Sequence, residues 1–101
     1  MKSARLIWPA ILVLALAAGS TTGRSEDRSY MDGVDMAGKD YRHLKLPRPR
    51  ARLCQEECRL DSSCKAWTFY RPGLLGPQAY CWLKSGVPTM RRDLCCISGL
   101  K

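Results

Sequence analysis

The six cysteines are the residues of this chain whose chemistry can decide its class. Their spacing is C-x3-C-x5-C-x16-C-x13-CC, from Cys54 to the adjacent pair Cys95 and Cys96. Zinc sites pair their ligands as C-x2-C with a second pair beyond, whereas the single histidine here, His43, lies outside the cluster. The sequence also lacks the C-x-x-C motif of redox dithiols. Structural disulfides explain the pattern best, and we expect no metal site and no cofactor.

Spacing favours one pairing among the first four cysteines. Cys58 and Cys64 bracket an expected helix end and turn, and a bond between them would clamp the helix to the next strand. Cys54 lies one helical turn earlier and would face the strand that carries Cys81. Four cysteines allow three connectivities, so spacing alone leaves the alternatives open. Cys95 and Cys96 could bond to each other, pair outside the chain, or stay free.

Two kinds of reactivity are weighed against this structural interpretation. Adjacent cysteines can form a strained disulfide, which is more easily reduced than an ordinary one. A redox or metal-responsive protein that uses Cys95 and Cys96 is therefore the alternative function. Catalysis has little support, because no Ser/His/acid arrangement is apparent and a Cys–His pair would need a free cysteine near His43. We expect no catalytic residues and no enzyme activity.

The N-terminus has the three-part pattern of a secretory signal peptide. Lys2 and Arg5 precede an apolar run from Leu6 to Ala18, and small residues follow. We assign residues 1–23 to the signal, with cleavage expected between about 17 and 23. The run is shorter than the ~20 residues that span a bilayer, so we expect no stable membrane span after its removal. A secreted or periplasmic location follows, where disulfides persist.

The mature chain divides into a short lead-in and one small domain. Residues 24–29 are polar and read as a flexible lead-in, and residues 30–101 form the domain. The formal charge of +8 stays positive without Lys2 and Arg5. A domain of this size gains only a few kcal/mol from its core, so covalent staples are expected.

Hydrophobic periodicity predicts one helix and several strands around the cysteines. Cys54 and Cys58 share one helix face, while Trp67, Phe69 and Leu83 are assigned to the core. Gly33 is expected at a bulge or a close approach. The expected helix is Arg50–Leu60, and the expected strands are Tyr30–Met36, Tyr41–Leu46, Lys65–Tyr70, Ala79–Lys84 and Leu94–Leu100.

Two surfaces are candidate binding sites. A basic cluster from Arg42 to Arg52, with Arg48, Arg50 and Arg52 at its end, could attract an anionic glycan, an acidic protein or an anionic membrane surface; an ordinary solvated basic face is the plain alternative. The Arg71–Gln78 loop, with Tyr70 and Tyr80 at its base, suits sugar stacking or docking of a protein. Nucleic acid is not expected, because of export and because aromatic residues do not alternate with the basic ones.

The motifs together resemble the PAN/apple domain family. They are Cys54-x3-Cys58-x5-Cys64-x2-Trp67-Thr68-Phe69, then Cys81-Trp82-Leu83-Lys84, and finally Ile97-Ser98-Gly99. The resemblance implies an α+β fold in which a small disulfide-stabilised antiparallel sheet cradles one α-helix, with bonds Cys54–Cys81 and Cys58–Cys64. It also implies a non-catalytic module that mediates protein–protein or protein–carbohydrate contacts.

The chain departs from this family pattern at the ends of the domain. Fuller apple domains have another cysteine pair that ties the N- and C-terminal ends together, and no cysteine precedes Cys54 here. The shortened form is similar to the PAN-like modules of bacterial exported proteins. The partner of Cys95 and that of Cys96 are therefore not given by the resemblance.

Overall fold

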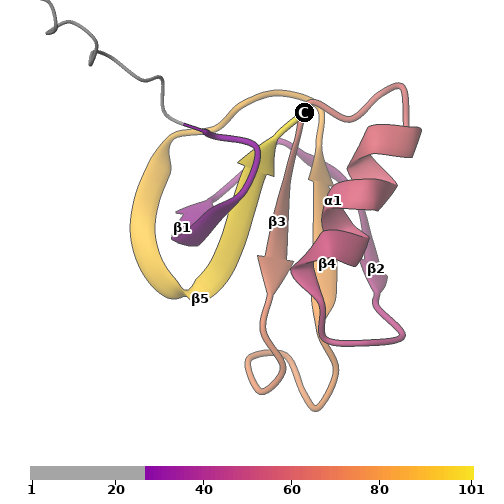
Figure 1. Ribbon diagram of the computed structural model, residues 1–101, viewed down its shortest axis with the longest axis vertical. Helices are drawn as coiled ribbons and strands as arrows, with labels where there is room; N and C mark the ends of the chain where they lie inside the picture. The colour runs from indigo at the N-terminus through magenta and orange to yellow at the C-terminus, as the bar shows by residue number, and fades with distance from the viewer. Residues whose placement is uncertain (1–26) are drawn as a thin grey trace, which may run out of the picture.

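The computed structural model describes residues 27–101, and the expected signal peptide lies outside them. One helix packs on a five-stranded antiparallel sheet of strand order β1-β5-β3-β4-β2 (Figure 1). This is the α+β arrangement that the sequence predicts. The elements are β1 (Met31–Met36), β2 (Asp40–Lys45), α1 (Ala51–Leu60), β3 (Ala66–Tyr70), β4 (Tyr80–Lys84) and β5 (Met90–Leu100).

Helix α1 begins after two prolines and ends at an aspartate turn. Pro47 and Pro49 keep the approach to the helix out of helical conformation, and Arg50 is the extended residue before it. Buried residues recur at three- and four-residue spacing, so one face of α1 lies against the sheet. At the other end the Asp61 carboxylate accepts a hydrogen bond from the Ser63 N–H (3.0 Å), which turns the chain toward β3.

The core lies between α1 and one face of the sheet. Trp67 and Phe69 alternate with residues of the opposite face along β3, and Leu83 does the same along β4. All three are almost completely buried, as the sequence predicts. The same cluster takes in the following residues of the helix, of its approach and of β5: Leu46, Ala51, Cys54, Cys58 and Ile97.

The face of the sheet opposite α1 is partly covered, because β1 and the first half of β5 curl away from the plane of β3 and β4 (Figure 1). Under this curl the Thr68 and Ser98 hydroxyls are hydrogen-bonded at 2.9 Å, and Ser98 also donates to the Val34 carbonyl. Lys84, 2% exposed, donates to the Asp40 carboxylate and to the Gly38 carbonyl. Thr68, Ser98 and Lys84 are therefore all hydrogen-bonded, whereas the buried Nε1 of Trp82 on the same face has no hydrogen-bond partner among the described residues.

Strand β5 is longer than predicted and contains a large bulge. The expected strand began at Leu94, whereas β5 begins at Met90. Asp32 pairs with Ile97 and Val34 pairs with Arg92, so Gly33 alone stands opposite residues 93–96. Gly33 has a φ of +75°, which glycine adopts readily and which lets the strands separate here. The extra residues break the alternation of buried and exposed side chains along β5, so the sequence pattern does not show where the strand begins.

The end of the expected lead-in is attached to the domain. The Leu100 N–H donates to the Arg28 carbonyl (2.9 Å), and the Gln55 side chain donates to the Ser29 carbonyl (2.9 Å). Tyr30 continues this contact, with its ring 5.9 Å from that of Trp67. Residues 28–30 thus close one side of the core.

Candidate functional site

Two disulfides form the framework that holds α1 against the sheet. Cys54–Cys81 joins the middle of the helix to β4, and Cys58–Cys64 joins the last helical turn to the start of β3. They are the pairs that spacing favours and that the resemblance implies. All four residues are at most 1% exposed, so external thiols have no access to these bonds.

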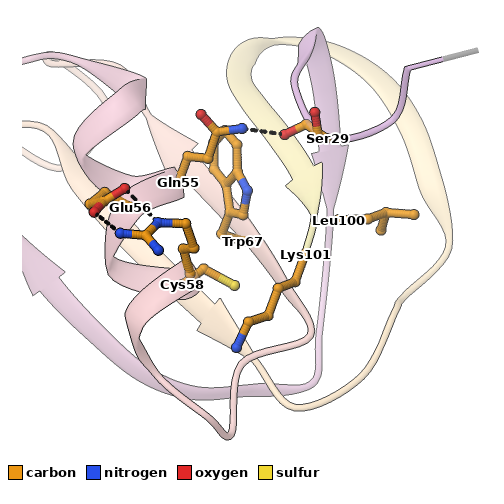
Figure 2. A pocket seen from close by; sticks show the side chains of 8 residues that line it. Ser29, Gln55, Glu56, Cys58, Trp67, Leu100 and Lys101 are labelled. Atoms are coloured by element: carbon orange, nitrogen blue, oxygen red, sulfur yellow. Dashed lines mark hydrogen bonds and ion pairs between the residues drawn. The ribbon is translucent and has the colours of Figure 1, made fainter.

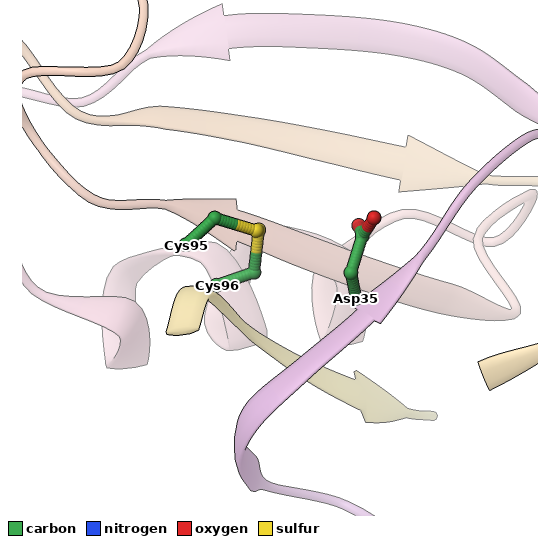
Figure 3. A group of neighbouring side chains, drawn as sticks. All are labelled: Asp35, Cys95 and Cys96. Atoms are coloured by element: carbon green, nitrogen blue, oxygen red, sulfur yellow. A yellow bond between two sulfur atoms is a disulfide. The ribbon is translucent and has the colours of Figure 1, made fainter. Parts of the chain in front are cut away.

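The third disulfide joins the neighbours Cys95 and Cys96 inside the β5 bulge (Figure 3). This pairing settles a point that the sequence left open. Cys96 is buried and Cys95 is partly exposed. The Asp35 carboxylate of β1 lies beside the pair, and one of its oxygens and the two sulfurs all lie within 4.8 Å of one another. Asp35 is only 4% exposed.

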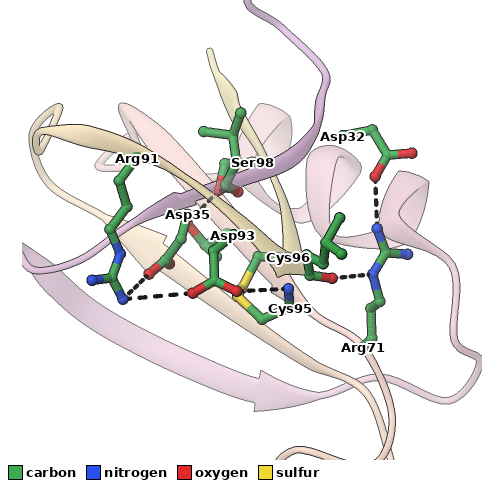
Figure 4. The surroundings of a disulfide bond; sticks show 11 residues. Asp32, Asp35, Arg71, Arg91, Asp93, Cys95, Cys96 and Ser98 are labelled. Carbon is green, nitrogen blue, oxygen red and sulfur yellow. Dashed lines mark hydrogen bonds and ion pairs between the residues drawn. A yellow bond between two sulfur atoms is a disulfide. The ribbon is translucent and has the colours of Figure 1, made fainter.

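Arg71 holds the bulge in place from the end of β3 (Figure 4). Its Nε donates to the Leu94 carbonyl (2.8 Å), its Nη2 to the Asp32 carboxylate (2.6 Å), and its backbone N–H to the Cys95 carbonyl (3.1 Å). The Asp93 carboxylate accepts a hydrogen bond from the Cys95 N–H (2.9 Å). Arg71 was predicted to contact a ligand; the structure gives its guanidinium these intramolecular partners, and ligand contact stays a prediction.

Aromatic rings form a row on the face of the sheet opposite α1. The His43 ring is stacked on Trp82, with centroids 4.7 Å apart, and Tyr70 contacts the other side of Trp82 at 5.8 Å. Tyr80 lies directly opposite Tyr70 on the neighbouring strand and so faces the same way. We call these four residues the aromatic row; none belongs to the helix-side core.

The two ends of the aromatic row differ in charge. Burial raises the pKa of Tyr70, and the nearby carboxylates of Asp35, Asp40 and Asp93 raise it further, while the Arg91 guanidinium lowers it. At the other end the exposed Lys45 lies opposite Tyr80 across the strand pair. Positive charge is therefore available to an anionic group at the Tyr80 end, whereas the carboxylates near Tyr70 are already paired with Arg91 and Lys84.

The predicted basic residues separate in space. Arg48 lines a groove of about 110 Å³ where the approach to α1 meets the loop between β3 and β4, next to Pro72 and Pro77. Arg50 is the exposed residue that precedes the helix. Arg52 turns to the other side, with its guanidinium 4.2 Å from the centre of the Tyr30 ring. Arg48 thus lies beside the loop that leads to Tyr80, and Arg52 does not.

A second hollow lies on the helix side, between α1 and the end of β5 (Figure 2). It holds about 320 Å³, and the indole of Trp67 lies between Gln55 and Lys101 at its base. Its polar groups are largely paired: Arg59 with Glu56, and Lys101 with the Asp61 carbonyl. Trp67 Nε1 has no partner but is fully covered, so the hollow presents few groups to a ligand.

Sequence reasoning missed part of this arrangement. It named Tyr70 and Tyr80 as aromatic candidates and His43 only as a member of the basic cluster. It placed Trp82 on the same strand face as Tyr80 but did not include Trp82 in a binding surface. It also missed Asp35, because only the β1–β5 pairing brings that residue to the cysteines. Alternation was enough to place Trp82 beside Tyr80, whereas no local pattern could have brought Asp35 to the cysteines.

Fold and site together define a small disulfide-stabilised α+β module with its covalent framework on one face and an aromatic row on the other. The model of the PAN domain family matches residues 34–84, half of the chain, and the protein therefore belongs to the PAN domain family. Domains of this family generally bind proteins or carbohydrates without catalysis, and such disulfide-rich domains are typical of extracellular settings.

The remaining comparisons add no relative. No curated protein and no solved structure matches the chain. Within residues 27–101, none of the helices has the length and apolar character needed to cross a membrane.

Proposed function

We propose that this PAN domain is an exported, non-catalytic module that binds an anionic saccharide on the aromatic row. The observation that carries the proposal is the stacked set of rings outside the core. Aromatic side chains add most to stability when they are buried, so a row that the helix-side core does not use suggests a binding surface. A protein ligand of acidic character is the other partner that the family suggests.

Charge and shape support a saccharide at one end of the row. Exposed His43 and half-buried Tyr80 offer flat rings for stacking against a sugar. Lys45 lies opposite Tyr80, and Arg48 lies at the loop residues that lead to Tyr80, so both can attract sulfate or carboxylate groups. We therefore place the anionic groups of the ligand next to Lys45 and Arg48.

Retention of the secreted protein on a dextran sulfate column tests this site. The variant Lys45→Ser/Arg48→Ser should elute at clearly lower salt than the parent protein. The variant Arg59→Ser/Lys65→Ser removes the same charge from exposed positions away from the row and should elute later than the first. Equal elution of both variants would show that only the net charge matters.

The contribution of ring stacking is tested with a second variant, which removes two rings but no permanent charge. His43→Ala/Tyr80→Ala should weaken binding of a sulfated oligosaccharide roughly 5- to 10-fold, the value of a ring contact of about 1–1.5 kcal/mol. The salt dependence of binding should be unchanged, because no permanent charge has been removed. If affinity is unchanged, the row is not a saccharide site, and an acidic protein remains the candidate ligand.

A further inference from the structure

The β5 bulge brings Asp35 next to the Cys95–Cys96 disulfide, whose Cys95 is partly exposed. After reduction, these three residues would offer three possible metal ligands. We propose that reduction of Cys95–Cys96 by a dithiol turns the bulge into a binding site for a thiophilic metal ion such as Zn²⁺, with Asp35 as the third ligand. The oxidised pair does not bind the ion, so the site is redox-gated. This inference is independent of the saccharide site.

Accessibility selects one disulfide of the three. Cys54, Cys58, Cys64 and Cys81 are at most 1% exposed, whereas Cys95 is partly exposed at the bulge. A thiolate of the dithiol attacks the Cys95 sulfur and releases the Cys96 thiolate. The second thiol of the reagent then attacks the mixed disulfide and frees Cys95. Two electrons pass to the protein, and the dithiol leaves as a cyclic disulfide.

Reduction should leave the fold intact. A bond between neighbours in the sequence closes no chain loop, so it constrains the unfolded chain little. Both framework disulfides remain. The bulge also keeps the Arg71 bonds to the Leu94 and Cys95 carbonyls and the Asp93 bond to the Cys95 N–H. The two thiols therefore stay near their present positions.

The geometry of the reduced group suits tetrahedral coordination. Zn²⁺ binds thiolate at about 2.3 Å and carboxylate at about 2.0–2.2 Å, which places neighbouring ligand atoms roughly 3.5–3.8 Å apart. The Asp35 oxygen and both sulfurs already lie within 4.8 Å of one another, so small side-chain rotations suffice. Two thiolates favour Zn²⁺ over hard cations such as Mg²⁺, and water completes the coordination. Each thiol releases its proton when it binds.

Arg91 competes with the metal for Asp35. Its Nη2 lies 3.3 Å from Asp35 and 3.7 Å from Asp93, and its side chain is 67% exposed (Figure 4). Such an exposed guanidinium can swing into solvent when a cation takes its place beside the buried carboxylate. Asp93 remains nearby and adds negative charge around the ion.

The first test is limited reduction of the oxidised protein with dithiothreitol, followed by alkylation and peptide mapping. Cys95 and Cys96 should be labelled at dithiol concentrations that leave the other four cysteines unlabelled. Labelling of all six cysteines together would overturn the selective step. Circular dichroism before and after reduction should show the same fold.

The second test is calorimetric titration with Zn²⁺ under anaerobic conditions. The reduced protein should bind one ion and the oxidised protein none; equal binding by the two forms would overturn redox gating. Asp35→Asn should lower affinity at least about tenfold, the loss expected when part of a metal site is removed. Unchanged affinity would exclude Asp35 as a ligand.

Arg91→Gln tests the role of Asp35 without changing Asp35 itself, so it can be used even if Asp35→Asn does not fold. Without its competitor, Asp35 should bind the ion up to about fivefold more tightly, the value of an exposed ion pair of about 1 kcal/mol. Arg92→Gln is the matched control, because Arg92 is exposed and points to the opposite side of the strand. Equal affinity of both variants would overturn the role of Asp35.

Discussion

A single methyl group on Gly99 should destabilise this domain strongly. Gly99 does not have a left-handed φ, so the effect of Gly99→Ala is steric. A β-carbon there would lie 2.2 Å from the Ser29 carbonyl oxygen and 2.6–2.7 Å from two atoms of the Trp67 indole. One neighbour is backbone and the other is a buried core ring, so neither can yield easily.

The cost follows from the two ways in which the structure can respond. Overpacking of a core costs about 1–3 kcal/mol. If residues 28–29 detach instead, the bonds from Leu100 to Arg28 and from Gln55 to Ser29 are lost, at about 1 kcal/mol each. Either response costs about 2 kcal/mol, which lowers the Tm by roughly 8–16 °C in a domain of this size.

Thermal unfolding followed by circular dichroism and tryptophan fluorescence measures this effect. Gly86→Ala is the matched control, because its new β-carbon would meet only the flexible side chain of Lys39, 2.8 Å away. That variant should keep its Tm within a few degrees. If Gly99→Ala also keeps its Tm, the close packing of residues 28–30 on β5 and Trp67 is wrong.

Two further predictions concern the framework and the buried ion pair. Replacing Cys54 and Cys81 by serine should lower the free energy of unfolding by about 3.5 kcal/mol, and replacing Cys58 and Cys64 by about 2 kcal/mol. The difference is expected because the first bond spans 27 residues and the second spans 6. Equal losses in urea unfolding would contradict the loop-length argument. Asp40→Ala should lower the free energy of unfolding by about 3 kcal/mol, because it leaves the buried Lys84 charge without its partner, whereas Lys84→Met should be nearly neutral. The same urea assay compares the two variants, and a larger loss for Lys84→Met would refute this account.

The helix-side half of the fold could be predicted from the sequence because its signals are local. The helix, its aspartate turn and the strands that carry Trp67 and Cys81 follow from periodicity over a few residues each. Cys54 and Cys58 share a helix face whatever the rest of the chain does. The helix was expected at Arg50–Leu60 and is found at Ala51–Leu60.

The other half depends on contacts between distant parts of the chain. Strand β5 lies between β1 and β3, so Asp35 reaches Cys95 only through a pairing of residues about 60 positions apart in sequence. The bulge at residues 93–96 removes the alternation that would have shown the start of β5. Likewise, the row from His43 to Tyr70 needs the order β2-β4-β3, and strand spacing alone does not give that order.

The placement of the disulfides would let one small domain combine a rigid fold with the reactive bulge and the binding surface proposed above. Both framework disulfides, Cys54–Cys81 and Cys58–Cys64, lie in the helix-side core, where they hold α1 to the sheet without using the opposite face. The strands β1 and β5 therefore depend on hydrogen bonds and on Arg71, while the Lys84–Asp40 pair joins β4 to β2. Reduction of Cys95–Cys96 would act only on this second half. A ligand or metal ion bound there could be exchanged without any loss of the framework, as long as Cys54–Cys81 and Cys58–Cys64 stay out of reach of the reductant.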